Sequence, residues 1–138
     1  MKAQRKRIIG DQAFLLTGLG LGFTLTVQIT TLTAGDFADP YAIITTLSRF
    51  FALTGSYLSI IGLLLIARIP PVENALGHDR LVVWHRKAMP YALYMITAHV
   101  LLVALGYAGS EGIVIGREVW KMVTTYPWML PAFAGFIL

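Results

Sequence analysis

The fold is decided by Trp84–His99, a stretch that reads WHRKAMPYALYMITAH. It opens with the cations Arg86 and Lys87 and continues as an apolar segment to Leu105. A cationic start followed by a long apolar run is typical of a helix that enters a membrane through the headgroup layer. We therefore expect a membrane-spanning helix that begins near Arg80.

The rest of the composition agrees with a small membrane protein. Hydrophobic residues make up 57% of the 138 residues, more than a soluble domain of this length needs. Two further apolar runs, Ala13–Leu32 and Ala42–Ala67, are at least as long as the ~20 residues that a span requires. The net charge of +4 does not indicate a nucleic-acid partner, because the cations lie at the ends of apolar runs, facing lipid headgroups. The chain has no cysteine, which excludes thiolate ligands and iron–sulfur clusters.

The first apolar run allows two interpretations. A cleaved signal peptide is one, since Ala34-Gly35 resembles a cleavage site, but the run is longer than a typical signal core and Asp11 interrupts its approach. A membrane helix is the other. Gly18 and Gly22 would then form a face for close packing between membrane helices, as would Gly55, Ser59 and Gly62 in the second run.

The connections and the end of the chain complete the predicted fold. We expect a loop at Ile69–Asp79, where two prolines stop the second helix, and the third helix to end between Gly106 and Gly112. Gly116–Thr125 is interpreted as an interfacial segment. Thr125 resembles the cap of a last helix, Tyr126–Leu138, whose 13 residues cover only about 20 Å. The predicted fold class is all-α: an integral membrane helical bundle with three complete transmembrane helices and a partial fourth.

The charges predict how the chain is oriented in a bacterial plasma membrane. With a cytoplasmic N-terminus, eight cations collect on the inner side, namely Lys2, Arg5, Lys6, Arg7, Arg68, Arg80, Arg86 and Lys87. Arg117 and Lys121 remain outside. This is a positive-inside distribution.

Two of the three histidines form the candidate site. His85 and His99 are fourteen residues apart, about 21 Å along a helix, and point within about 40° of each other. Imidazoles at two membrane depths on one face are suited to hold two haem irons. The alternative interpretation of His99 is a neutral core histidine bonded to a threonine or a carbonyl. The alternative interpretation of His85 is an ordinary interfacial histidine beside Arg86 and Lys87. Arg49, about two turns inside its helix, lies at a depth like that of His99 and suits a haem propionate. His78 falls in the predicted loop and should be solvated.

Several short motifs together resemble the ferric-reductase-like transmembrane domain, the family of NADPH oxidases and bacterial membrane ferric reductases. They are Arg68-Ile69-Pro70-Pro71-Val72-Glu73, Gly77-His78-Asp79-Arg80-Leu81, Trp84-His85-Arg86, Ala98-His99-Val100 and Gly106-Tyr107-Ala108. The resemblance covers most of residues 1–138 as the N-terminal part of that domain. It implies that His85 and His99 each supply one ligand to one of two b-type haems, which carry electrons across the membrane.

The same resemblance implies parts that this sequence lacks. The family's second histidine pair lies on an opposing helix, and FAD and NAD(P)H bind in a later domain. We therefore expect a missing C-terminal half or a partner chain to supply the opposing ligands. Two alternatives remain: a haem-free membrane scaffold or assembly subunit, and a single-haem anchor that passes electrons to quinone.

Overall fold

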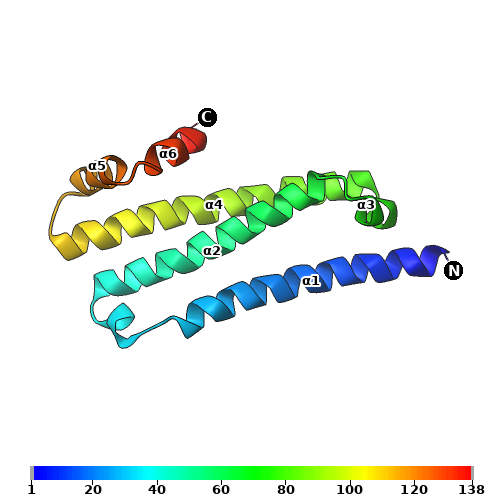
Figure 1. Ribbon diagram of the computed structural model, residues 1–138, viewed down its shortest axis with the longest axis horizontal. Helices are drawn as coiled ribbons and strands as arrows, with labels where there is room; N and C mark the ends of the chain where they lie inside the picture. The colour runs from blue at the N-terminus through cyan, green and yellow to red at the C-terminus, as the bar shows by residue number, and fades with distance from the viewer. Residues whose placement is uncertain (1, 138) are drawn as a thin grey trace. The chain divides into compact units, whose positions relative to one another are not determined.

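The computed structural model describes residues 2–137, which form long helices joined by short connections (Figure 1). The elements are α1 (Lys2–Thr30), the 3-10 helix η1 (Ala34–Phe37), α2 (Pro40–Ile66), α3 (Pro70–Leu76), α4 (His78–Glu111), α5 (Ile115–Thr125) and α6 (Met129–Ile137). No strand occurs within residues 2–137. The predicted all-α class is confirmed.

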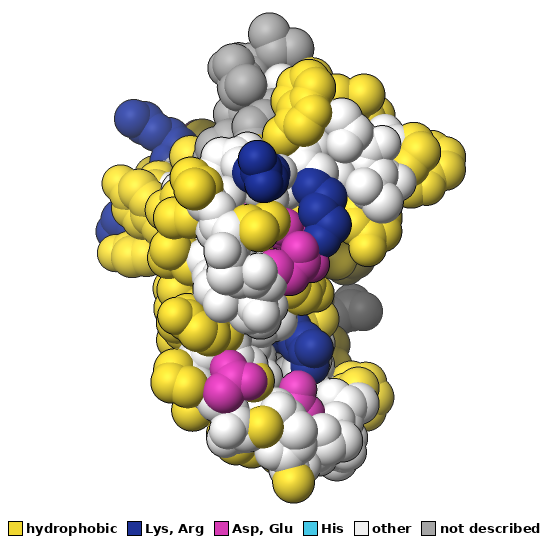
Figure 2. Space-filling view, turned by 90° about the vertical axis from the view of Figure 1, so that its left-hand side faces the viewer, with side chains coloured by type: hydrophobic (Ala, Val, Ile, Leu, Met, Phe, Trp, Pro, Cys, Tyr) yellow, Lys and Arg dark blue, Asp and Glu magenta, His cyan; other side chains and the backbone are white. Residues whose placement is uncertain are grey.

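Three helices are long and apolar enough to cross a membrane: Arg7–Thr30, Pro40–Ile66 and His78–Glu111. Each exceeds the ~20 residues that match the hydrocarbon layer. Their large apolar side chains point outward to an unusual degree, with Phe23 72% and Leu16 67% exposed. Figure 2 shows many exposed hydrophobic side chains on one face, together with Lys, Arg, Asp and Glu side chains. Such a surface suits lipid as its solvent.

The chain divides into two compact units, which are described separately. The first unit contains Met1–Leu32 and Arg49–His99. The second contains Thr33–Ser48 and Val100–Leu138. The three histidines and Arg49 all belong to the first unit.

Close contacts at glycines hold the helices of the first unit together. Gly55 of α2 is buried, and a Cβ added there would lie 2.9 Å from Cγ1 of Ile96 on α4. A Cβ on Gly62 would collide with the sulfur of Met89. These contacts confirm the close packing expected in the second apolar run at Gly55 and Gly62. They also show that the two helices are antiparallel. Gly62 comes seven residues after Gly55 on α2, and its neighbour Met89 comes seven residues before Ile96 on α4.

The packing of α1 differs from the prediction. A Cβ added at Gly18 or at Gly22 would have no neighbour within 4 Å, so neither glycine packs closely against the described residues. The close approach is at Gly20, where an added Cβ would lie 3.1 Å from Cζ of Tyr57. Gly20 is two residues from each of the other glycines, roughly 200° around the helix, so it faces the opposite side.

The prediction of a loop at Ile69–Asp79 is wrong, because this segment contains the helix α3. Pro70 and Pro71 begin this helix instead of only stopping the previous one, since the first turn needs no N–H donor from proline. α4 then begins at His78, two residues before the predicted start at Arg80. It ends at Glu111, as predicted, and continues as a helix through Pro90.

The second unit is built around the start of α2. The Asp39 carboxylate accepts hydrogen bonds from the backbone N–H groups of Tyr41 and Ala42, at 2.8 and 2.9 Å, and so caps the helix. Tyr41 lies against Gly109, where α4 has no side chain to obstruct the ring. The following connection, Gly112, has a positive φ of 65°, which glycine adopts without strain.

The end of the chain corrects one boundary. α5 ends at Thr125, and Tyr126 is its C-cap. The last helix begins only at Met129, so Thr125 is not the cap of that helix as predicted.

Candidate functional site

His85 is held by one specific hydrogen bond between two helices. Its Nδ1 lies 2.8 Å from the carbonyl oxygen of Gly62 on α2. A carbonyl can only accept, so Nδ1 carries the hydrogen and donates it. In the neutral imidazole the other ring nitrogen, Nε2, then keeps its lone pair. This tautomer is the one that binds a metal through Nε2, with the ring oriented by a bond from Nδ1–H.

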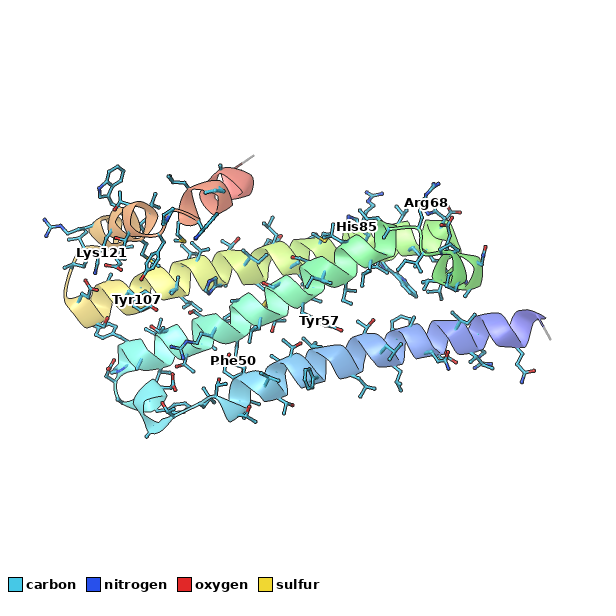
Figure 3. All side chains as sticks on the ribbon, in the orientation of Figure 1. Phe50, Tyr57, Arg68, His85, Tyr107 and Lys121 are labelled. Carbon is cyan, nitrogen blue, oxygen red and sulfur yellow. The ribbon has the colours of Figure 1, made fainter. Side chains whose placement is uncertain are left out.

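Glycine at position 62 makes this bond possible. Gly62 is buried, and a Cβ there would lie 3.7 Å from Nδ1 of His85 and would collide with Met89. Without a side chain, α2 approaches α4 closely enough for the imidazole to reach the backbone. Figure 3 shows His85 on the half of α4 nearer its N-terminus.

His99 lies on the same uninterrupted helix, and both histidines are half-buried. Fourteen residues of α4 separate them, about 21 Å at ~1.5 Å per residue. At that separation the two imidazoles cannot bind one iron together. They can only serve two separate sites.

Arg49 lies on α2 at nearly the same level as His99. Gly55 lies against Ile96, and Gly62 lies against Met89. Three residues from the first of these contacts, the same antiparallel register places Ala52 opposite His99. Arg49 precedes Ala52 by three residues, about 4.5 Å along the helix axis. The side chain of Arg49 is exposed. By this register, Arg49 and His99 lie at similar levels along the α2–α4 pair.

His78 is not a loop residue, as predicted, but the first residue of α4. Its Nδ1 lies 4.0 Å from Oε1 of Glu73 on α3, and its side chain is 38% exposed. It is part of the connection between α3 and α4 and lies seven residues before His85.

A haem and a bare metal ion make different demands on the side chains of a protein. Within residues 2–137, no three side chains of His, Cys, Asp or Glu gather closely enough to hold a metal ion. A haem needs fewer protein ligands, because the porphyrin occupies the equatorial positions and the protein supplies axial ones. The Nε2 of His85 is a suitable axial donor.

A charged cluster in the second unit was not predicted. Nζ of Lys121 on α5 lies 2.5 Å from Oε1 of Glu111 on α4 and 3.8 Å from Oε2 of Glu118. Glu118 is buried, and its Oε2 accepts no hydrogen bond from the described residues. The hydrogen bond to Glu111 raises the pKa of Lys121 above its ordinary 10.5. The only sequence signal was the three charges on the predicted interfacial segment, which do not reveal that one is buried.

Comparisons of the chain with protein-family models, with curated proteins and with solved structures found no match.

Proposed function

We propose that this chain is a haem b-binding transmembrane segment of an oxidoreductase that carries electrons across a membrane, of the ferric-reductase-like type. The observation that supports it most is the bond from His85 to the Gly62 carbonyl. It orients an imidazole inside an apolar helix pair and leaves Nε2 as a donor. Ionisable residues within membrane helices are costly and usually functional.

The residues of the chain have distinct roles in this proposal. His85 binds one haem iron through Nε2, and Gly62 holds its ring in place. His99 binds a second iron about 21 Å away along the helix. The guanidinium of Arg49 offers a planar pair of donors to a propionate carboxylate of the haem at His99. A bound haem would supply a one-electron carrier at each position.

The proposal requires ligands from outside these residues. Two six-coordinate b-type haems held by imidazoles need four histidines, and the sequence contains three. A further segment or a partner chain therefore supplies the opposing ligands. FAD and NAD(P)H would act through a domain outside this sequence. By the positive-inside rule the N-terminus is cytoplasmic, with His85 near the inner surface and His99 in the outer half of a bacterial plasma membrane.

Haem titration of the chain in lipid nanodiscs tests the proposal. The chain alone should bind haem weakly, with one axial position open on each iron. Added imidazole should occupy that position and produce sharp low-spin b-type absorption bands. His85→Ala and His99→Ala should each remove about half of this signal, because each supplies one ligand to one haem.

His78→Ala is the matched control, since it removes a third imidazole from the same helix and should leave the haem content unchanged. Two tightly bound low-spin haems in the isolated chain without added imidazole would disprove the ligand assignment. So would equal loss of haem in His78→Ala and His85→Ala.

A haem-free scaffold or assembly subunit is the second candidate. One observation favours it: Gly18 and Gly22 leave open space on an exposed apolar face of α1, where a helix of another protein can approach closely. This candidate predicts no haem binding even with imidazole present. It also predicts that Gly18→Leu abolishes co-purification with a partner protein.

A further inference from the structure

The first unit contains an apolar pocket of about 480 Å³. Side chains from α1, α2, α3 and α4 line it, including Phe14, Leu58, Val72, Trp84 and Lys87. Phe14 and Trp84 form one wall as an edge-to-face pair, with ring centroids 4.8 Å apart at 61°. Lys87 is the one charged residue among the described residues that line it.

A second, cationic pocket adjoins the first. Val83, Arg86 and Lys87 line its volume of about 310 Å³. Lys87 belongs to both pockets, so an apolar space and a pair of cations meet at one side chain. Among the described residues neither Arg86 nor Lys87 forms an ion pair, and both are exposed.

The position of Lys87 along α4 corresponds to the membrane boundary. α4 has 34 residues, about 51 Å, which exceeds a ~30 Å hydrocarbon layer by about 10 Å at each end. Lys87 lies nine residues after His78, about 13 Å from the start of the helix. Trp84 and Tyr91 flank it, and both residue types are enriched at the headgroup level.

The lining of the apolar pocket indicates what kind of molecule fits it. The hydroxyl of Thr17 already donates to the carbonyl of Ala13 at 2.8 Å. The other lining residues with side-chain donors, Trp84, Lys87 and Tyr91, all belong to α4. The walls that α1, α2 and α3 form are otherwise apolar and suit an acyl chain. The unpaired cations at the boundary, in turn, complement a phosphate.

We propose that the first unit binds one anionic phospholipid, with an acyl chain in the apolar pocket and its phosphate between Arg86 and Lys87. The inference does not depend on haem binding. It assigns the pair Arg86 and Lys87 a role in lipid recognition, in addition to any effect on topology.

Native mass spectrometry of the full chain, released from nanodiscs of phosphatidylglycerol or phosphatidylcholine, tests the proposal. One phosphatidylglycerol should remain bound per chain after delipidation, and phosphatidylcholine should be retained less. Arg86→Gln and Lys87→Gln should each reduce phosphatidylglycerol retention about fivefold, the usual effect of one cation on an anionic lipid. Arg80→Gln, an exposed cation on the same helix, is the matched control and should have no effect.

Ala13→Phe tests the apolar part, because a larger side chain fills the pocket and should displace both lipids while the cations remain. Inorganic phosphate should not displace phosphatidylglycerol, because it has no acyl chain. Equal retention of the two lipids, or an equal loss in Arg80→Gln, would overturn the headgroup assignment. Full retention in Ala13→Phe would overturn the acyl-chain assignment, and retention of a quinone in place of phospholipid would overturn the proposal as a whole.

Discussion

The hydroxyl of Tyr57 on α2 donates a hydrogen bond to the carbonyl oxygen of Thr17 on α1, over 2.6 Å. This bond joins two membrane helices at the level where Gly20 brings them into close contact. Tyr57→Phe removes the donor and keeps the ring. It should lower the free energy of unfolding by about 0.6 kcal/mol, the average for such bonds between membrane helices. Unfolding in mixed micelles with a denaturing detergent measures it, and an unchanged midpoint would contradict the expected stabilisation.

Gly20 and Gly18 provide a matched pair on one helix. Alanine at either position gains the same helix propensity, but only at Gly20 does its Cβ meet Tyr57, which the bond to Thr17 holds in place. Gly20→Ala should therefore be less stable than Gly18→Ala by about 1–3 kcal/mol, the usual cost of overpacking. The same unfolding assay compares them. Equal stabilities would show that Tyr57 moves aside at no cost.

Lys121 should titrate above its ordinary pKa because it donates to Glu111. A raised pKa in the folded protein means that the contact stabilises the fold at neutral pH. The stabilisation is lost only as the pH rises from 10.5 through the higher folded value. The ¹³Cε shifts of labelled lysines report each titration by nuclear magnetic resonance. Glu111→Gln should return the pKa of Lys121 toward 10.5, and a Lys121 pKa unchanged by this substitution would disprove the cause.

Arg49 should affect one haem of the loaded protein and not the other. Arg49→Leu removes the cation proposed for a propionate and should shift the midpoint potential of the haem at His99 alone. Arg49→Lys should restore part of the effect, since it keeps the charge but loses the planar pair of donors. Redox titration followed by absorption measures both potentials, and Arg117→Leu, which removes an arginine of the second unit, is the control. Equal shifts at both haems would contradict the pairing.

The orientation of the chain can be tested independently of haem. The cation distribution predicts that Asp36 faces outward and Glu73 faces the cytoplasm. Reporter fusions at these two positions should give opposite signals. A cytoplasmic signal from Asp36 would reverse the orientation and exchange the inner and outer sites.

The long helices were predictable because composition over some twenty residues outweighs any single position. The apolar runs around Gly55 and Ile96 each become a helix close to its expected bounds. The run around Gly20 becomes part of α1, which begins at Lys2, well before the expected start at Ala13. The helix α3 was missed because Pro70 and Pro71 end one helix and also begin another, and local sequence does not distinguish these roles. The last helix starts later than predicted because Tyr126 caps α5 in place of starting α6.

The site was predictable only in part. The spacing of His85 and His99 is a property of one helix, so the sequence contains it. The bond from His85 to Gly62 joins residues 23 positions apart, and it depends on how closely two helices pack. The same reason explains Gly20: three glycines at alternate positions look equivalent in the sequence, and only the neighbouring Tyr57 distinguishes them.

Pro90 makes α4 easier to bend at one point along its length. Proline has no N–H, so the Arg86 carbonyl lacks the helix bond that every neighbouring turn has. The missing bond falls between His85 and His99, where the helix bends at lower energetic cost than elsewhere. Bending there changes the distance between the two imidazoles. In the electron-transfer role proposed above, the rate of transfer would depend on that distance, so Pro90 would control how strongly motion of one helix changes the rate.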